Sequence, residues 1–167
     1  KCVEPRTLAQ TDMIQVHRVL DRMTRQRTAL INQIRGFLNE YGIVVAQGKE
    51  KLLVAMPDLL EDAENGLTPS SRALFQQMVE QWRQANEAIK QIEKGLKGKA
   101  RTDEDAQRLM KMKGVAVKIS TATIAHAGNG HGYKSGRHFS ANLGLVPKEH
   151  SSGGQQKLGG ITKRGNE

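Results

Sequence analysis

Apolar residues recur at alternating steps of four and three along two long stretches of the chain. The first series is Val16, Leu20, Met23, Leu30, Ile34, Phe37 and Tyr41, interrupted only at Arg27. The second series is Phe75, Met78, Trp82, Ala85, Ile89, Ile92 and Leu96. Heptad spacing of this kind keeps an apolar stripe on one face of an underwound helix. The pattern therefore predicts two long helices whose stripes are buried against a partner.

Turn and cap residues mark the ends of these helices. Gly42 is placed to end the first helix, and Thr68 followed by Pro69 is typical of the start of the second. Between them, leucines on both sides of Pro57 predict a shorter helix; they are Leu52, Leu53, Leu59 and Leu60. Two matched helices joined by a reversing connector predict an antiparallel helical hairpin or coiled coil over residues 1–98. Pairing of the stripes between two chains, which would give a homo-oligomer, is equally compatible.

A second domain is expected over residues 99–167. The run Lys97–Lys99 indicates a linker, and Thr102, followed by three acidic residues, predicts an N-cap at the start of a new helix. A helix through Leu109 and Met112 and another from Ile119 to Gly128 then predict a helix-hairpin-helix. The expected fold class is mostly α.

Gly114 lies in this expected hairpin, with Lys113 and Lys118 on either side. A glycine there allows a tight turn whose amide groups can approach a phosphate. Ala116 weakens this interpretation, because DNA-binding hairpins usually carry a second glycine at that point. A simple helical corner is the alternative.

Charge is unevenly distributed along the chain. There are 26 Lys and Arg against 17 Asp and Glu, a net charge of +9. Residues 49–98 hold seven basic and eight acidic residues, whereas residues 101–167 hold 11 basic and 5 acidic. A basic surface favours a polyanionic partner, with nucleic acid ahead of an acidic membrane surface. No apolar run is long enough to cross a membrane, and the single cysteine, Cys2, fits a reducing cytoplasm.

Basic and amide side chains also follow one side of the first helix. Arg18, Arg22, Arg25 and Arg35 fall at helical spacings, together with Asn32 and Asn39. Such a row can meet phosphates at regular intervals. A merely solvated basic face is the alternative.

No metal site is predicted on this chain. The acidic residues Glu61, Asp62 and Glu64 and the run 103–105 are explained by solvated faces and helix starts. The histidines His17, His126, His131 and His138 lack the spacing of a ligand set.

After a short helix ending near Leu143, six glycines between Gly144 and Gly165 predict an irregular segment or short strands. Ser151 and Ser152 lie within it as candidate nucleophiles, with Lys157, Lys163 and Arg164 as candidate phosphate contacts. Catalysis would need a base such as His150 or Glu149, or charge that stabilises the alkoxide and the attacked phosphate. Neither a nucleotide phosphate loop nor the Gly-x-Ser-x-Gly elbow of hydrolases is present. A flexible basic loop that only binds is the alternative.

Three motifs in this segment closely resemble the C-terminal domain of the serine-dependent DEDD transposases of bacterial insertion sequences, which are guided by a bridge RNA. They are GLVP at 144–147, SSGG at 151–154 and LGGITKRGN at 158–166. The segments 27–38 and 40–43 are similar to the helical part of the same family. The resemblance therefore covers nearly the whole chain.

This resemblance implies a larger bacterial cytoplasmic protein with a RuvC-like nuclease domain, a coiled coil and a serine domain. The serine of a Ser-Gly motif, here Ser152 with Ser151 as the second choice, attacks a DNA phosphodiester and becomes joined to the strand. Divalent metal, Mg²⁺, is expected on the RuvC-like domain, which is absent here, and no cofactor is expected on this chain. DNA, a guide RNA and a second copy of the protein are the expected partners. The chain is thus expected to be an enzyme fragment, inactive alone and cut short at its C-terminus; the alternative is a non-catalytic coiled-coil module that dimerises and binds nucleic acid.

Overall fold

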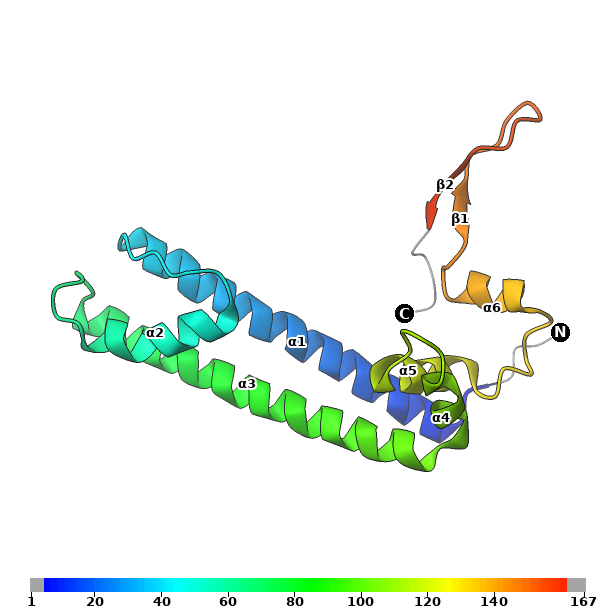
Figure 1. Cartoon of the computed structure of the whole chain (residues 1–167), viewed down its shortest axis with the longest axis horizontal. Coiled ribbons are helices and arrows are strands. Elements are labelled where there is room, and N and C mark those ends of the chain that lie inside the picture. The colour runs from blue at the N-terminus through cyan, green and yellow to red at the C-terminus, as the bar shows by residue number, and fades with distance from the viewer. Residues whose placement is uncertain (1–4, 162–167) are drawn as a thin grey trace. The chain divides into compact units, whose positions relative to one another are not determined.

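The computed structural model describes residues 5–161, and the prediction of a mostly helical chain is confirmed (Figure 1). The helices are α1 (Leu8–Glu40), α2 (Lys49–Glu61), α3 (Pro69–Thr102), α4 (Glu104–Met110), α5 (Val117–Ala127) and α6 (Gly136–Asn142). Two short strands follow, β1 (Pro147–Glu149) and β2 (Leu158–Ile161). The chain divides into two compact units, one formed by Gln15–Thr102 and the other by Asp103 onward together with the chain up to Ile14.

In the first unit, α1 and α3 run antiparallel, and α2 packs with both around a common core (Figure 1). The core contains Ile31, Ile34, Leu38, Leu52, Met56, Leu67, Phe75, Met78, Val79 and Trp82. Every member of the stripe on α3 is buried or half-buried, as its spacing predicts. On α1 the stripe is also confined to the covered side as far as Phe37, but Tyr41 follows the helix and is 41% exposed. Ile31 and Leu38 are buried beyond the predicted stripe because the core that α2 joins widens the covered side of α1.

Arg27, the one interruption in the stripe of α1, makes a polar contact with α3. Its Nη1 donates a hydrogen bond of 2.8 Å to Oδ1 of Asn86. Both side chains are half-buried. A polar pair inside an otherwise apolar interface favours one alignment of two helices over shifted ones, since a shift would leave both groups without their partner.

The connector between α1 and α2 begins with the glycine expected to end the first helix. Gly42 has φ +73°, and the amide of Ile43 donates a hydrogen bond of 3.0 Å to the carbonyl of Leu38. The guanidinium of Arg35 then donates to the carbonyls of Ala46 and Gly48, at 3.0 and 2.7 Å. The connector is therefore fixed to the side of α1.

The connector between α2 and α3 is organised around Arg72. Its guanidinium donates to the carbonyls of Leu59, Leu60, Asp62 and Leu67 and to Oδ1 of Asn65, at 3.2, 2.7, 2.7, 3.1 and 2.9 Å. The predicted cap of α3 is confirmed, because Oγ1 of Thr68 accepts the amide of Ser71 at 3.1 Å. One arginine and one threonine thus hold the reversal that makes α3 antiparallel to α1.

The predicted linker at Lys97–Lys99 is wrong. α3 continues through these residues to Thr102, because Leu96 and Ala100, one helical turn apart, are both buried. The predicted N-cap at Thr102 is wrong for the same reason, since Thr102 still belongs to α3. Asp103 caps α4 instead, and its Oδ1 accepts the amide of Ala106 at 2.9 Å.

In the second unit, α4 and α5 pack together and are joined by a turn at Gly114, which has φ +89°. Met112, expected within the first of these helices, lies in the turn and is exposed. α6 follows, with Ser135 as its N-cap and an edge contact of 5.2 Å between the rings of Tyr133 and Phe139. Across residues 5–161, none of the helices combines the length and apolar character needed to span a membrane.

Candidate functional site

The glycine-rich segment that carries the two candidate serines folds into a β-hairpin (Figure 1). β1 and β2 are antiparallel, with Pro147 opposite Ile161 and Glu149 opposite Leu158. The register is irregular between these two pairs, where β2 has one residue more than β1. Beyond the strands, the amide of His150 donates to the carbonyl of Lys157 at 2.9 Å, and Ser152 bridges to Gln155. The pairing thus continues up to the turn.

Two glycines make this turn. Gly153 and Gly154 have φ +59° and +77°, and the amide of Gln155 donates to the carbonyl of Ser152 at 3.1 Å. Positive φ at both central residues is the signature of the two-residue turn whose twist matches that of paired strands. The Ser-Gly-Gly sequence therefore places Ser152 at the last pair before the turn.

The pairing assigns the two serines to opposite faces of the hairpin. Side chains alternate along a strand, and residues directly opposite each other share a face. One face carries His150 and Ser152 with Lys157 and Gln155, which lie across from them. The other face carries Glu149 and Ser151 with Leu158 across the strand.

The surroundings of the two hydroxyls differ accordingly. Oγ of Ser151 donates a hydrogen bond of 2.5 Å to Oε1 of Glu149. Ser152 has basic neighbours on its own face and no carboxylate there within residues 147–161, where Glu149 is the sole acidic residue. Both serines are exposed. An approaching phosphate meets attraction on one face and repulsion on the other.

The other predicted contacts lie on separate elements. Lys113 and Lys118 are both exposed, Lys113 in the turn between α4 and α5 and Lys118 in the first turn of α5. Lys157 is on the hairpin itself. Lys163 and Arg164 lie outside the described residues.

The predicted basic row on α1 belongs to the first unit. Arg18, Arg22 and Arg25 are exposed. Arg25 pairs with Asp21 at 2.6 Å, and Arg22 donates to Gln26 at 3.1 Å. Arg35, by contrast, is half-buried and holds the connector to α2, a structural role that helical spacing alone does not reveal.

A magnesium site does not fit the residues described. Among residues 5–161 no group of three or more His, Cys, Asp or Glu side chains is placed to hold a metal ion. The Mg²⁺ implied by the resemblance is expected on a RuvC-like domain, and no step below is assigned to a metal held by this chain.

Residues 106–167 match the sequence model of the Transposase IS116/IS110/IS902 family. The chain is also 37% identical over 164 residues to the transposase for insertion sequence element IS1111A of Coxiella burnetii, covering 98% of this chain and 45% of that protein. By sequence, the chain is therefore similar to transposases of bacterial insertion sequences, and residues 106–167 match the IS116/IS110/IS902 family.

Two further transposases of bacteria show the same extent of similarity. The transposase for insertion sequence element IS1328 of Yersinia enterocolitica is 36% identical over 165 residues, covering 98% of this chain and 48% of that protein. A probable family 20 transposase of Pseudomonas aeruginosa is 34% identical over 151 residues, covering 90% of this chain and 45% of that protein. The chain thus spans about half the length of the curated relatives it matches. No solved structure matches it significantly.

The family model and the individual relatives match different extents of the chain. The IS116/IS110/IS902 model begins at Ala106, within α4, and includes α5, α6 and the hairpin. The helical hairpin of α1 and α3 lies outside that match, yet similarity to the IS1111A transposase extends over 98% of the chain. The sequence similarity to that transposase therefore includes the helical unit.

Proposed function

We propose that this chain is the coiled-coil and serine-bearing part of a DNA transposase. In this proposal Ser152 attacks a DNA phosphodiester and forms a covalent protein–DNA intermediate during strand exchange. The observation that carries it is the position of Ser152, exposed at the last pair before a glycine turn and on the basic face of a hairpin within the family-matched segment.

The chemistry conserves the bond that is exchanged. Oγ of Ser152 forms a bond to phosphorus and gives up its proton, while the bond from phosphorus to one deoxyribose oxygen breaks and that oxygen takes up a proton. The seryl phosphodiester can then be attacked by another deoxyribose hydroxyl, so strands are rejoined without an external energy source. A serine hydroxyl is a weak nucleophile alone, so this step requires a base or cations that stabilise the developing charge.

Other components complete the proposed enzyme. A RuvC-like domain with carboxylates would supply Mg²⁺, which polarises phosphates. A guide RNA would select the DNA, and pairing of two copies would bring two strands together. Under this proposal the 167-residue chain is catalytically inactive alone.

The test is a denaturing gel that detects protein covalently joined to end-labelled DNA. The protein is extended to the length of its relatives and compared with its Ser152→Ala and Ser151→Ala variants. We expect Ser152→Ala to bind DNA and form no adduct. Loss of the adduct in Ser151→Ala alone would transfer the role to Ser151, and an undiminished adduct in both variants would reject the serine mechanism.

A second candidate is a nucleic-acid-binding module without chemistry of its own. It is favoured by the exposed arginines on α1, Arg18, Arg22 and Arg25, which face solvent in the helical unit. This candidate predicts binding that weakens steeply with salt and is indifferent to either serine.

A further inference from the structure

We propose that the hairpin face bearing Lys148, His150 and Lys157 binds a DNA phosphodiester and holds it against Ser152, while the face bearing Glu149 and Ser151 points away from the DNA. The inference rests on the proposed function. It adds Lys148 and His150 as positioning residues and gives a physical reason for choosing between the two serines.

The register of the hairpin places these residues together. The amide of His150 is bonded to the carbonyl of Lys157, and Ser152 bridges to Gln155, so the intervening pairs are fixed. Lys148 and His150 precede Ser152 by four and two residues on the same arm of the hairpin and therefore share its face, because the extra residue of the irregular register beside Lys148 lies on β2. Along a strand, alternate residues are about 6.6 Å apart, so one phosphate group and its neighbour can contact several of them.

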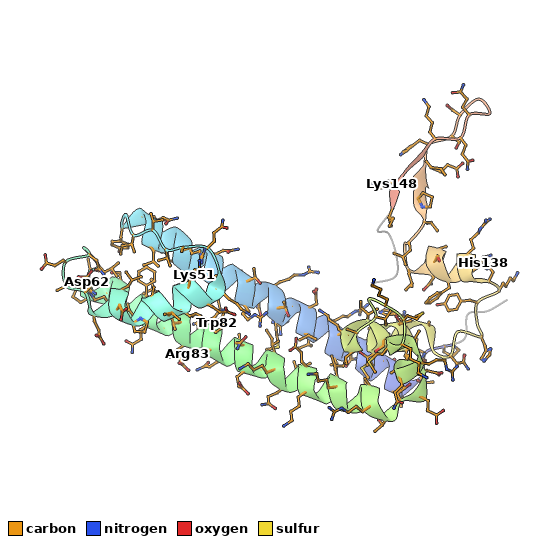
Figure 2. All side chains as sticks on the ribbon, viewed as in Figure 1. Lys51, Asp62, Trp82, Arg83, His138 and Lys148 are labelled. Atoms are coloured by element: carbon orange, nitrogen blue, oxygen red, sulfur yellow. The ribbon has the colours of Figure 1, made fainter. Side chains whose placement is uncertain are left out.

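Lys148 is further exposed by the residue that lies across from it. A Cβ added to Gly159 would lie 3.6 Å from Cβ of Lys148, which shows that the two residues face each other across the strands. Because Gly159 has no side chain, nothing from β2 covers the stem of Lys148 at that position. Figure 2 shows the Lys148 side chain on the hairpin.

The charge on this face is not neutralised within the hairpin. Lys148 and Lys157 are exposed, and the ion pairs found among residues 5–161 do not include either of them. The one carboxylate of the segment, Glu149, is on the opposite face and accepts the hydroxyl of Ser151. Ammonium groups and an imidazole beside an exposed serine form a surface complementary to a phosphodiester.

The shape of the element favours a DNA duplex over an RNA duplex as the partner. A two-stranded ribbon has the width to enter the major groove of B-form DNA, whereas the major groove of an RNA helix is too narrow. Every residue from Pro147 to Ile161 is exposed, so the ribbon is free to make such an approach. The partner proposed is therefore the DNA backbone.

Binding to a fluorescein-labelled DNA duplex, measured by anisotropy over a series of salt concentrations, tests this surface. The double variant Lys148→Gln/Lys157→Gln is compared with Lys94→Gln/Lys97→Gln, which removes the same charge from exposed positions on α3. Loss of two phosphate contacts should reduce the slope of log affinity against log salt by about 1.8, because each contact contributes about 0.9. We expect this reduction for the hairpin variant and a markedly smaller one for the α3 variant.

Equal effects of the two double variants would overturn the proposal, because they would show that only net charge matters. A reduced slope with an RNA duplex but not with the DNA duplex would also overturn it. His150→Ala should weaken DNA binding more than His150→Gln, which keeps a hydrogen-bond donor; equal binding by both at the wild-type level would remove His150 from the surface.

Adduct formation separates this proposal from the proposed function. In the extended protein, the hairpin variant should form less adduct than the α3 variant. An adduct that requires Ser152 but is unchanged in Lys148→Gln/Lys157→Gln would refute the basic face and leave the serine mechanism standing. An adduct that survives Ser152→Ala would refute the serine mechanism, whatever the salt slopes show.

Discussion

Replacing Arg72 should unfold the helical unit at a markedly lower urea concentration. Its guanidinium holds the end of α2 to the start of α3, with its two shortest hydrogen bonds, each 2.7 Å, to the carbonyls of Leu60 and Asp62. A hydrogen bond from a charged donor contributes about 1.5–3 kcal/mol net. If only these two bonds are counted, at about 1.5 kcal/mol each, Arg72→Met should lower the free energy of unfolding by about 3 kcal/mol.

The partial rescue by lysine is the sharper part of this prediction. Arg72→Lys keeps the positive charge, but an ammonium group cannot span acceptors on both sides of the connector as a planar guanidinium does. We expect it to recover no more than about half of the loss, that is about 1.5 kcal/mol. A full recovery would mean that charge, and not the fork of donors, stabilises the reversal.

Trp82 provides the assay. It is the only tryptophan of the chain and is buried in the core of the same unit, so its fluorescence during urea unfolding reports this unit selectively. Figure 2 shows Trp82 and Arg83 as neighbours on α3. Arg83→Met is the matched control, because Arg83 is exposed and its ion pair with Glu80 is long, at 3.9 Å. This variant should lower the free energy of unfolding by less than about 0.5 kcal/mol. Equal losses for Arg72→Met and Arg83→Met would refute the reasoning.

Two further predictions concern Arg27 and the hairpin turn. Arg27→Ala and Asn86→Ala should each destabilise the helical unit. A double-mutant cycle followed by Trp82 fluorescence should give a coupling energy of about 1 kcal/mol, because the two side chains are hydrogen-bonded to each other at 2.8 Å. Additive losses of stability would show that the pair does not fix the alignment of the helices. Gly154→Ala should weaken the hairpin by about 1 kcal/mol, because Gly154 has φ +77°. Faster hydrogen exchange of the His150 amide would report this, with Gly154→Asn expected to lie closer to the wild type, and unchanged exchange in Gly154→Ala would contradict the assigned turn.

The sequence anticipates the helices better than it anticipates what joins them. Heptad spacing identifies the stripe of α3 in full because burial acts on each position of a regular helix in the same way. The linker predicted at Lys97–Lys99 fails because glycine is tolerated in a helix whose neighbouring turns are buried, here through Leu96 and Ala100. Local propensity is outweighed there by packing, which is a property of the fold.

The roles of the basic residues also differ in how far the sequence predicts them. Arg35 and Arg72 hold connectors through backbone carbonyls that are distant in sequence, so no local pattern distinguishes them from the exposed Arg22. Arg27 was detectable, because a charge in an apolar stripe requires a partner, although the sequence does not say that the partner is Asn86. The composition of the glycine-rich end indicates Ser151 and Ser152 as candidates, but the faces on which they lie depend on pairing across the turn.

Because the hairpin ends in a two-residue turn, the face on which each serine lies depends on whether the number of residues between it and β1 is odd or even. Because facing alternates with each residue, adding or removing one residue between Ser152 and β1 would exchange the surroundings of every side chain on one side of the insertion. Changes of two residues would restore them. Between Glu149 and Ser152, length variation is therefore constrained to even steps unless a bulge accommodates the odd residue, as the irregular register between Pro147 and Glu149 does on β2. An odd step without a bulge would turn the serine toward the opposite face of the ribbon.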